Sequence, residues 1–581
     1  MAGDAGGSRP MDICTIIAAN YAPFARVLAE SFRAHHPQGR VFVLVIDDVE
    51  GFLDPPNEPF EIVRPQDLSI DEFDRMAALY SILELSTAVK PWLLRYLLHE
   101  RGAAALAYLD PDIEVFDRLD ELEALLHEHR LVVTPHLTAP MPRDGLRPSE
   151  TDILIAGSYN LGFIALTPGP DTDALLDWWG ERLATDCIVA PERGFFVDQR
   201  WMDFAPGLVP SFHVLRDPGY NVAYWNLPSR EVKRDGDRWT VNGRPLRFFH
   251  FSGFDPKQPG QLSKHQNRIQ LADHPALAEL GARYAESLLE RTPARARPWS
   301  YKFDRLPDGT PIDAAVRLGY RQALEAGELP RSPFSPEGAR ELLRWLATSP
   351  GGPAMPNRYL LALRDTRPDL RAAFPDVAGV DGPRLVAWAQ TIGRAVIPAP
   401  LVPGALTADR SAAPFGVNVA GYFDSVLGVG EAARQVSRAL EAVGTRVATQ
   451  NLVAARSRQD ADLVRAAGES ARFAINLVCV NADVLPAFAD DAGPSFFADR
   501  YTIGLWWWEV AQFPERWLRS FDHVDEVWAG SRHVADALGK VSPVPVVHIV
   551  QPVHIEEPPP ADRATLGLPE GFLFGFSFDY E

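Results

Sequence analysis

Cysteine is scarce in this chain, with three residues among 581. Cys14, Cys187 and Cys479 lie far apart and form no CxxC pair, which argues against a zinc module and against a disulfide framework. Basic residues are outnumbered, with 57 Lys and Arg against 77 Asp and Glu, for a formal net charge of -20. Because proteins hold nucleic-acid backbones mainly through Lys and Arg, this balance excludes a nucleic-acid role.

Long apolar runs are missing as well. The first ten residues, MAGDAGGSRP, are small and polar, and the apolar stretch after them is interrupted by Asn20, Tyr21 and Arg26. No signal peptide or membrane span is readable in this pattern. We therefore expect a cytoplasmic protein, and a peripheral association with a membrane stays open.

The chain has enough apolar residues, 46%, to bury several cores. Short β-branched runs, DICTIIA and VFVLVIDD, flank a helical pattern at 22–35, and an apolar run at 104–115, AALAYLDPDIEV, predicts a further strand. Strands that alternate with helices predict an α/β fold with a parallel sheet. We expect this first α/β domain to span residues 11–290.

The composition and the hydrophobic pattern of the sequence change after this domain. Prolines and short amphipathic stretches such as GARELLRWLA predict a small helical region over 291–410. A second α/β pattern follows over 411–581, with FGVNVAGYF, FAINLVCVN, YTIGLWWWE and VDEVWAGS as strands and GFLFGFSFDY as the last one. The length fits about three or four domains.

Two carboxylates stand directly after the apolar run AALAYL, as Asp110 and Asp112 around Pro111. At the end of a strand, such a pair can direct oxygen atoms at a hard cation, which in turn can bridge the oxygens of a diphosphate. The competing interpretation is a turn in which Asp110 caps the next segment and Pro111 stiffens it. Context has to decide between a metal site and a turn.

His250 is the second element of the predicted site. It follows the apolar run in RPLRFFHFSG, where a neutral ring nitrogen at a strand end can bind a metal, and Gly253 and Lys257 after it suit an approach to phosphate. Taken alone, a histidine such as His250 is more often a hydrogen-bonded core residue than a metal ligand.

Four segments, in this order, carry a family resemblance: YLDPDIEVF, YNLGFIAL, FVDQRW and HFSGFDPKQP. Over residues 11 to about 270 they resemble family 8 of the glycosyltransferases, the glycogenin and lipopolysaccharide galactosyltransferase group with the GT-A fold. The resemblance implies a retaining transferase in which Asp110, Asp112 and His250 bind Mn²⁺ (or Mg²⁺) and Lys257 faces the diphosphate.

The same resemblance implies roles for further residues. The nucleoside is expected at the first strand and its loop, with phosphate or sugar hydroxyls at a helix start: Ala18, Asn20, Tyr21, Asp47 or Asp48, and Lys90. Asn160 and the pair Asp198 and Gln199 resemble the family's sugar-facing, catalytic residues, although RWMDFAP after Asp198 and Gln199 departs from the family pattern. Strand-end hydrogen bonding and turn chemistry are the competing explanations.

The second α/β pattern contains Gly428, Gly430 and Ala433 at a helix start, a G-x-G-x-x-A arrangement that suits an anion or simply tight packing. GYFDSVLGVGEAARQ, LWWWEVAQFPERW and VDEVWAGSRHVADAL resemble the Rossmann-like amino-terminal half of a GT-B glycosyltransferase of family 4. That resemblance implies that the donor-binding half is missing or belongs to a longer protein. The adjacent tryptophans suit sugar stacking or core burial.

Together these patterns predict a metal-dependent glycosyltransferase that moves a hexose from a nucleotide sugar, UDP- or GDP-linked, to a glycan or lipid-linked acceptor in surface polysaccharide biosynthesis. Two alternatives stay open. One is nucleotidyl transfer to a sugar phosphate, which also uses paired acids and Mg²⁺. The other is a non-catalytic carbohydrate-binding or scaffold protein, which would bind glycan without metal or nucleotide sugar.

Overall fold

The computed structural model describes residues 11–573 except 51, 293–298, 330, 353–354, 392, 404–412, 453–471, 499, 555–562, 564–566 and 570. Most of the expected last strand, GFLFGFSFDY, therefore lies outside the described residues. The chain divides into two compact units, 1–345 and 346–581. These units do not follow the three ranges expected from the sequence, and the three-domain division stays a prediction.

Unit 1 is built on a seven-stranded sheet in the order β10-β6-β7-β4-β1-β2-β3. All neighbours pair in parallel except those of β7, which runs antiparallel to both β4 and β6. The expected α/β, Rossmann-like class is confirmed, and the sheet is parallel except at β7. The strands are β1 (Asp12–Ile17), β2 (Val41–Val45), β3 (Glu61–Val63), β4 (Leu106–Leu109), β6 (Leu131–Pro135), β7 (Tyr159–Leu166) and β10 (Phe212–Val214).

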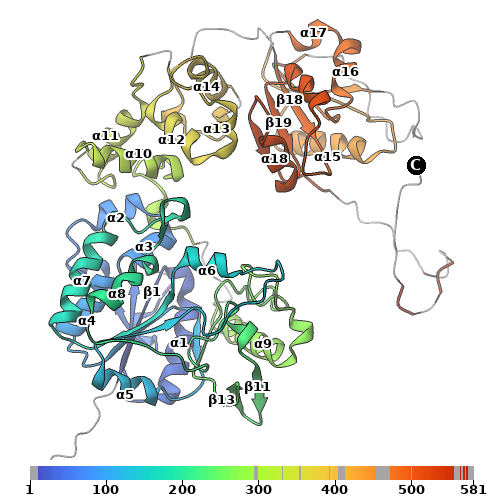
Figure 1. Cartoon of the computed structure of the whole chain (residues 1–581). Coiled ribbons are helices and arrows are strands. Elements are labelled where there is room, and N and C mark those ends of the chain that lie inside the picture. Colours follow the sequence, from blue (N-terminus) through green and yellow to red (C-terminus); the bar gives the residue numbers. More distant parts are fainter. Residues whose placement is uncertain are drawn as a thin grey trace, which may run out of the picture. The chain divides into compact units, whose positions relative to one another are not determined.

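Helices surround this sheet (Figure 1). The helical pattern expected at 22–35 is α1 (Ala22–His35), whose buried face repeats every three or four residues, as an amphipathic helix requires. The other helices that begin in unit 1 are α2 (Phe73–Leu79), α3 (Ile82–Ala88), α4 (Lys90–His99), α5 (Asp120–Glu128), α6 (Glu150–Ala156), α7 (Pro170–Leu183), α8 (Ala205–Leu208), α9 (Pro275–Glu290), α10 (Ala314–Glu325) and α11 (Pro336–Ala347).

The single strand expected at 104–115 is two strands. β4 ends at Leu109, and β5 (Ile113–Val115) pairs with β14 (Phe248–His250) in a separate small sheet. The break falls at Pro111, because proline has no backbone N–H to continue a ladder. Two further small sheets join β8 (Val189–Ala190) to β9 (Phe195–Phe196) and β11 (Val232–Asp235) to β12 (Arg238–Val241) and β13 (Arg244–Pro245).

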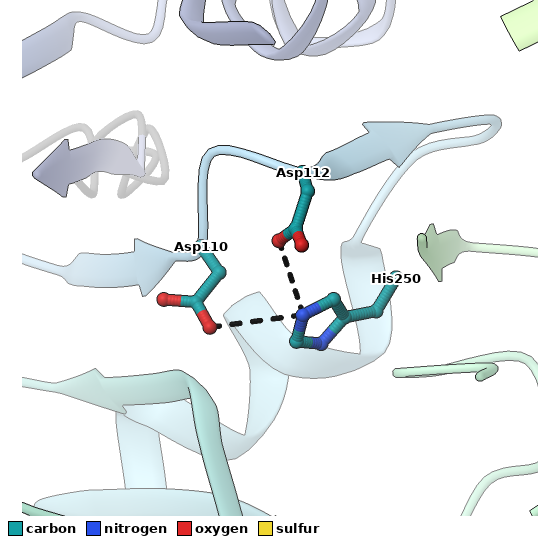
Figure 2. Close-up of side chains that lie close together, drawn as sticks. All are labelled: Asp110, Asp112 and His250. Atoms are coloured by element: carbon teal, nitrogen blue, oxygen red, sulfur yellow. Dashed lines mark ion pairs between the residues drawn. The ribbon is translucent and has the colours of Figure 1, made fainter. Parts of the chain in front are cut away.

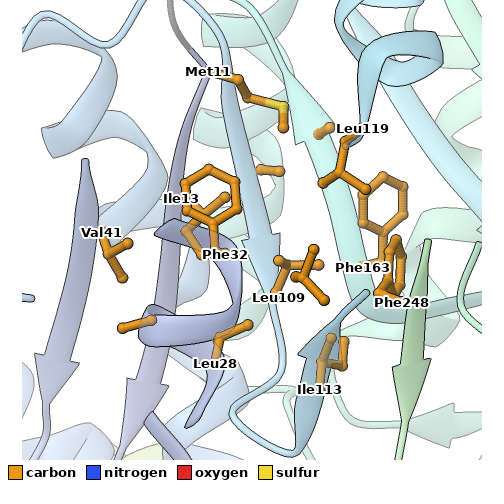
Figure 3. Packing of buried hydrophobic residues seen from close by; sticks show 14 of the residues in the cluster. Met11, Ile13, Leu28, Phe32, Val41, Leu109, Ile113, Leu119, Phe163 and Phe248 are labelled. Carbon is orange, nitrogen blue, oxygen red and sulfur yellow. The ribbon is translucent and has the colours of Figure 1, made fainter. Parts of the chain in front are cut away.

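The main core of unit 1 holds the β5–β14 pair in place. Ile13, Leu109 and Phe163 from the large sheet pack in one buried cluster with Ile113 of β5 and Phe248 of β14 (Figure 3). The rings of Phe163 and Phe248 lie 5.4 Å apart. Apolar burial therefore fixes the two short strands that border the candidate site.

Unit 2 contains a six-stranded, all-parallel sheet in the order β16-β15-β17-β18-β19-β20. Its strands are β15 (Val417–Gly421), β16 (Val447–Asn451), β17 (Ile475–Val478), β18 (Tyr501–Trp506), β19 (Glu526–Ala529) and β20 (Val546–His548). Its helices are α12 (Arg358–Thr366), α13 (Pro368–Ala373), α14 (Asp381–Gln390), α15 (Gly428–Ala442), α16 (Leu485–Ala492), α17 (Pro494–Phe497) and α18 (Arg532–Gly539).

Among the residues that the structure describes, we find no helix with the length and hydrophobicity needed to cross a bilayer. Cys14, Cys187 and Cys479 are each buried and free.

Candidate functional site

The two carboxylates lie in the connection between β4 and β5. The backbone N–H of Asp110 donates to the carbonyl of Gly162 on β7 (2.8 Å), and the hydroxyl of Tyr108 donates to Oδ1 of Asp110 (2.7 Å). These bonds leave Oδ2 of Asp110 facing the ring of His250 (Figure 2). Asp112 follows two residues later and faces the same ring.

His250 reaches the acidic pair because β14 pairs with β5. His250 lies opposite Ile113 in this ladder, and the next residue, Phe251, donates its N–H to the carbonyl of Asp112. Nε2 of His250 lies 3.1 Å from Oδ1 of Asp112 and 3.7 Å from Oδ2 of Asp110. One ligand atom from each of the three side chains lies within 4.8 Å of the others.

The hydrogen bonds of Asn221 define the ring tautomer of His250. The amide nitrogen of Asn221 donates to Thr134 Oγ1 (2.8 Å) and Asn160 Oδ1 (3.1 Å), so its oxygen is left as the acceptor for Nδ1 of His250 (3.2 Å). With the hydrogen on Nδ1, the lone pair of Nε2 points at the two carboxylates. This donor set, two carboxylates and one imidazole held by an outer amide, fits Mn²⁺ or Mg²⁺.

The electrostatics of Asp110, Asp112 and His250, called the trio from here on, also favour a bound cation. Burial lowers the pKa of His250, but the charges of Asp112 and Asp110 and the hydrogen bond to Asp112 outweigh it, so the pKa is raised overall. Burial raises the pKa of Asp110, opposed by Lys90 and His250. A positive charge between these groups is therefore favoured, and a proton on Nε2 and a divalent cation compete for that position.

Gly162 on β7 leaves space for the trio. A Cβ atom there would lie 2.4 Å from Cε1 of His250 and 2.7 Å from Oδ2 of Asp110, closer than atoms pack. The sequence interpretation missed Gly162, although a glycine inside an apolar strand is a signal of close approach.

The predicted sugar-facing residues share a cavity of about 460 Å³ with two of the trio. Asn160 is fixed by its neighbours: its Oδ1 accepts from the N–H of Gly162 (3.2 Å), and its amide nitrogen lies 3.4 Å from Nε2 of His136. Nδ1 of His136 donates to the carbonyl of Gly157 (2.8 Å), and burial lowers the pKa of His136 to about 4, so its ring is neutral. The lining residues that we predicted are Asp110, His250, Lys90, Asn160, Asp198 and Gln199.

Lys90 is no surface residue. Its ammonium donates to Oδ2 of Asp198 (2.5 Å) and to the carbonyl of Leu161 (2.8 Å), and it lies 4.1 Å from the centre of the Tyr108 ring. Lys90 and Asp198 are both almost fully buried. Burial raises the pKa of Asp198, opposed by the charge of Lys90. Gln199 donates to the carbonyl of Ala156 (2.8 Å), which orients its amide beside this pair.

The residues predicted for the nucleoside are more dispersed. Asp47 is buried and accepts from Ala19 N (2.8 Å) and Trp299 Nε1 (3.0 Å), whereas Asp48 is exposed and pairs with Lys302 at 3.1 Å. Both line a second cavity of about 1010 Å³, whose lining does not include the metal trio.

The loop between β1 and α1, which holds Ala18, Asn20 and Tyr21, connects the two regions. Tyr21 lies near the acidic pair: burial, Asp112 and Asp110 all raise the pKa of its hydroxyl.

Gly253, which we predicted to face phosphate, has φ +73, and a Cβ there would meet the ring of His265 at 2.4 Å. Lys257 is exposed, and its backbone N–H donates to Asp255. The structure therefore does not bring Lys257 into the lining of the smaller cavity.

Several residues of the site carried no recognised signal in the sequence. Asn221, Tyr108 and His136 orient predicted residues, and the ring of Trp225 lies edge-on to His250 with centroids 5.2 Å apart. Asn221 adopts φ +50, a conformation that asparagine tolerates better than most residues. The contacts of Asn221, His136 and Trp225 join segments far apart in the chain, so only the fold reveals them, whereas Tyr108 and Asp110 are two residues apart.

In unit 2, Gly430 in the first turn of α15 serves packing. A Cβ on Gly430 would lie 2.4 Å from the carbonyl of Tyr422, so the turn into the helix needs glycine there. Trp506 is buried against Phe513 and Phe521. Both observations favour the structural interpretations of these motifs over an anion site or a sugar platform.

The chain matches no protein-family model. It is 30% identical over 150 residues to YfnF, an uncharacterised protein of Bacillus subtilis, an alignment that covers 25% of this chain and 46% of YfnF. It is 24% identical over 232 residues to YfnD of the same organism, covering 39% of this chain and 72% of YfnD. The chain thus spans about half the length of the first of these relatives.

Among solved structures, the chain is similar to the galactosyltransferase LgtC in complex with donor and acceptor sugar analogues. The identity is 18%, the coverage is 48% of this chain and 96% of LgtC, and the TM-score is 0.29. A glycosyltransferase involved in glycosylation of the major capsid of PBCV-1 is 11% identical, with coverage of 42% and 93% and a TM-score of 0.26. These likenesses by themselves assign no activity to this chain.

Proposed function

We propose that unit 1 is a metal-dependent glycosyltransferase that transfers a hexose from a UDP- or GDP-linked sugar to a glycan or lipid-linked acceptor, with retention at the anomeric carbon, in surface polysaccharide biosynthesis. The observation that carries the proposal is the convergence of Asp110, Asp112 and His250 at the edge of a cavity lined by Asn160, Asp198 and Gln199. The proposed site lies on the cytoplasmic side, free or peripheral to a membrane.

The three residues of the trio suit a divalent cation that binds the diphosphate of the donor. When bound, Mn²⁺ or Mg²⁺ supplies positive charge beside the leaving group. His250 presents Nε2 because Asn221 holds the proton on Nδ1, and Gly162 keeps the approach open. Tyr108 holds Asp110 in place through its hydroxyl.

In the proposed reaction, the bond between the anomeric carbon and the diphosphate oxygen breaks, and its electron pair leaves with the nucleoside diphosphate. The acceptor hydroxyl oxygen forms the new bond to that carbon, and its proton passes to the released diphosphate. Asn160 and Gln199 provide amides at the cavity wall that suit hydrogen bonding to sugar hydroxyls. The Lys90–Asp198 ion pair belongs to the same cavity wall, where the Asp198 carboxylate would face a bound sugar.

A donor screen tests the proposal. The full chain is incubated with UDP- and GDP-sugars with and without Mn²⁺, and thermal unfolding is recorded, since a ligand bound only to the native state raises the melting temperature. We expect one donor to stabilise the protein only with metal, and to yield nucleoside diphosphate and a glycoside. Release of pyrophosphate from a sugar phosphate and a nucleoside triphosphate would instead indicate nucleotidyl transfer. Glycan binding without donor or metal would indicate a non-catalytic protein.

A further inference from the structure

The cavity that holds the proposed reaction centre has a polar floor and an apolar rim. The floor consists of Asp110, Asn160, Asp198, Gln199 and His250. The apolar rim, as we define it, consists of Leu83, Ile153, Ile155, Val189 and Phe196, which line the same cavity. Three segments far apart in the chain, α3, α6 and the β8–β9 hairpin, therefore contribute apolar side chains to one opening.

Helix α6 is unusual among these segments. It carries the run Ile153, Leu154 and Ile155, yet none of its residues is buried. Leu154 is 71% exposed and Ile155 is 41% exposed. The helix is fixed at its start by a capping box between Ser149 and Asp152, so its apolar side is presented on a defined element. Packing within the described residues of unit 1 leaves Leu154 and Ile155 largely exposed.

The other two segments each add an exposed apolar side chain, although both also contain buried residues. Leu83 on α3 is 57% exposed, and Val189 on β8 is 47% exposed. Single exposed apolar residues are ordinary, but a contiguous group around a cavity marks a binding surface. The apolar rim and the polar floor line the same cavity. A ligand whose apolar part lies on the rim would therefore have its polar part at the floor.

We propose that the acceptor of this enzyme is an alkyl- or lipid-linked glycoside, whose hydrocarbon chain lies against Leu83, Ile155 and Val189 while its sugar hydroxyl reaches the floor of the cavity. This inference rests on the proposed function and specifies its acceptor. A free glycan has no hydrocarbon chain, so the apolar side chains of the rim would stay exposed to water. A hydrocarbon chain covers it, and burial of each methylene strengthens binding about three- to fourfold at most.

The test compares methyl and octyl β-D-glucoside, the latter below its micelle-forming concentration, as ligands of the full chain. We expect the octyl compound to bind at least about tenfold more tightly in the wild type. Leu83→Gln and Ile155→Gln should remove most of this preference. Both positions are exposed, so folding is preserved. Leu289→Gln on α9 is the matched control, because Leu289 is 51% exposed and lies outside the rim.

Several outcomes overturn the inference. Equal affinity for the two glucosides would do so, as would an equal loss in Leu289→Gln, which would indicate non-specific hydrophobic binding. Binding to phosphatidylcholine vesicles that depends on Leu83, without preference for the octyl glucoside, would assign the rim to a membrane surface. Donor stabilisation with Mn²⁺ is measured in the same samples: if it persists, only the acceptor inference fails, and if no donor binds, the proposed function fails with it.

Discussion

Nδ1 of His250 lies 3.2 Å from Oδ1 of Asn221, and both side chains are almost completely buried. The amide of Asn221 has no freedom to flip, because its nitrogen already donates to Thr134 and Asn160. One asparagine thus determines which nitrogen of His250 faces the carboxylates. The proposed metal site therefore depends on Asn221 as well as on its three proposed ligands.

Removing one carboxylate tests the metal site directly. Asp112→Asn replaces a ligand oxygen that lies 3.1 Å from His250 by a neutral amide. Wild-type protein should gain about 2.7 kcal/mol of unfolding free energy when Mn²⁺ is present at a hundred times its dissociation constant, and the variant should gain almost none. Thermal unfolding with and without Mn²⁺ checks this. Equal stabilisation of both proteins would reject the site.

Two substitutions of Asn221 separate the role of its oxygen from that of its nitrogen. Asn221→Gly tolerates the positive φ but removes the acceptor for His250, and Mn²⁺ affinity should fall about 10- to 100-fold. Asn221→Asp keeps an acceptor oxygen at the same position, so it should retain clearly more affinity. Titration calorimetry with Mn²⁺ gives both values. An identical loss in the two variants would show that the tautomer of His250 does not matter.

Gly162→Ala tests the close approach at β7. The added methyl group would have to displace the ring of His250 or the carboxylate of Asp110, so we expect Mn²⁺ affinity to fall by at least about tenfold. Gly207→Ala on α8 is the control, because a Cβ there meets nothing within 4 Å. Manganese electron paramagnetic resonance measures free metal in each case. Wild-type affinity in Gly162→Ala would contradict the geometry.

The Lys90–Asp198 pair predicts a non-additive effect on stability. Lys90→Met leaves the carboxylate of Asp198 buried without its partner, which should cost about 3–5 kcal/mol of unfolding free energy. The double variant Lys90→Met with Asp198→Asn removes both charges and should recover part of that loss. Urea unfolding of the full chain, fitted for the transition of unit 1, measures the cycle. Additive losses would mean that the two charges do not interact.

Glu526 predicts a pH effect in unit 2. This buried carboxylate accepts from Trp388 Nε1 (2.9 Å), Trp528 Nε1 (2.7 Å) and Tyr501 Oη (3.2 Å), and burial raises its pKa above the usual 4.5 despite these bonds. As pH rises from about 4.5 through the higher folded value, the unfolded chain loses this proton first, so wild-type stability should fall relative to Glu526→Gln. Urea midpoints between pH 4 and 8 give the difference. Parallel profiles would contradict the raised pKa.

Local patterns were sufficient for much of the fold. The helix expected at 22–35 is α1, and the runs before it and after it are β1 and β2, since the periodicity of apolar residues is imposed by the element itself. The direction of a strand could not be predicted from such local patterns. The run of β7 reads the same in either direction, and only its position between β4 and β6 made it antiparallel.

The sequence by itself determined that two carboxylates stand at a strand tip, because Asp110 and Asp112 are neighbours along the chain. The tertiary structure alone decided that His250 reaches them, that Lys90 is buried against Asp198, and that Gly162 clears the space between. Each of these depends on the pairing of distant segments, and that pairing follows from the burial of a whole core rather than from any local run of residues.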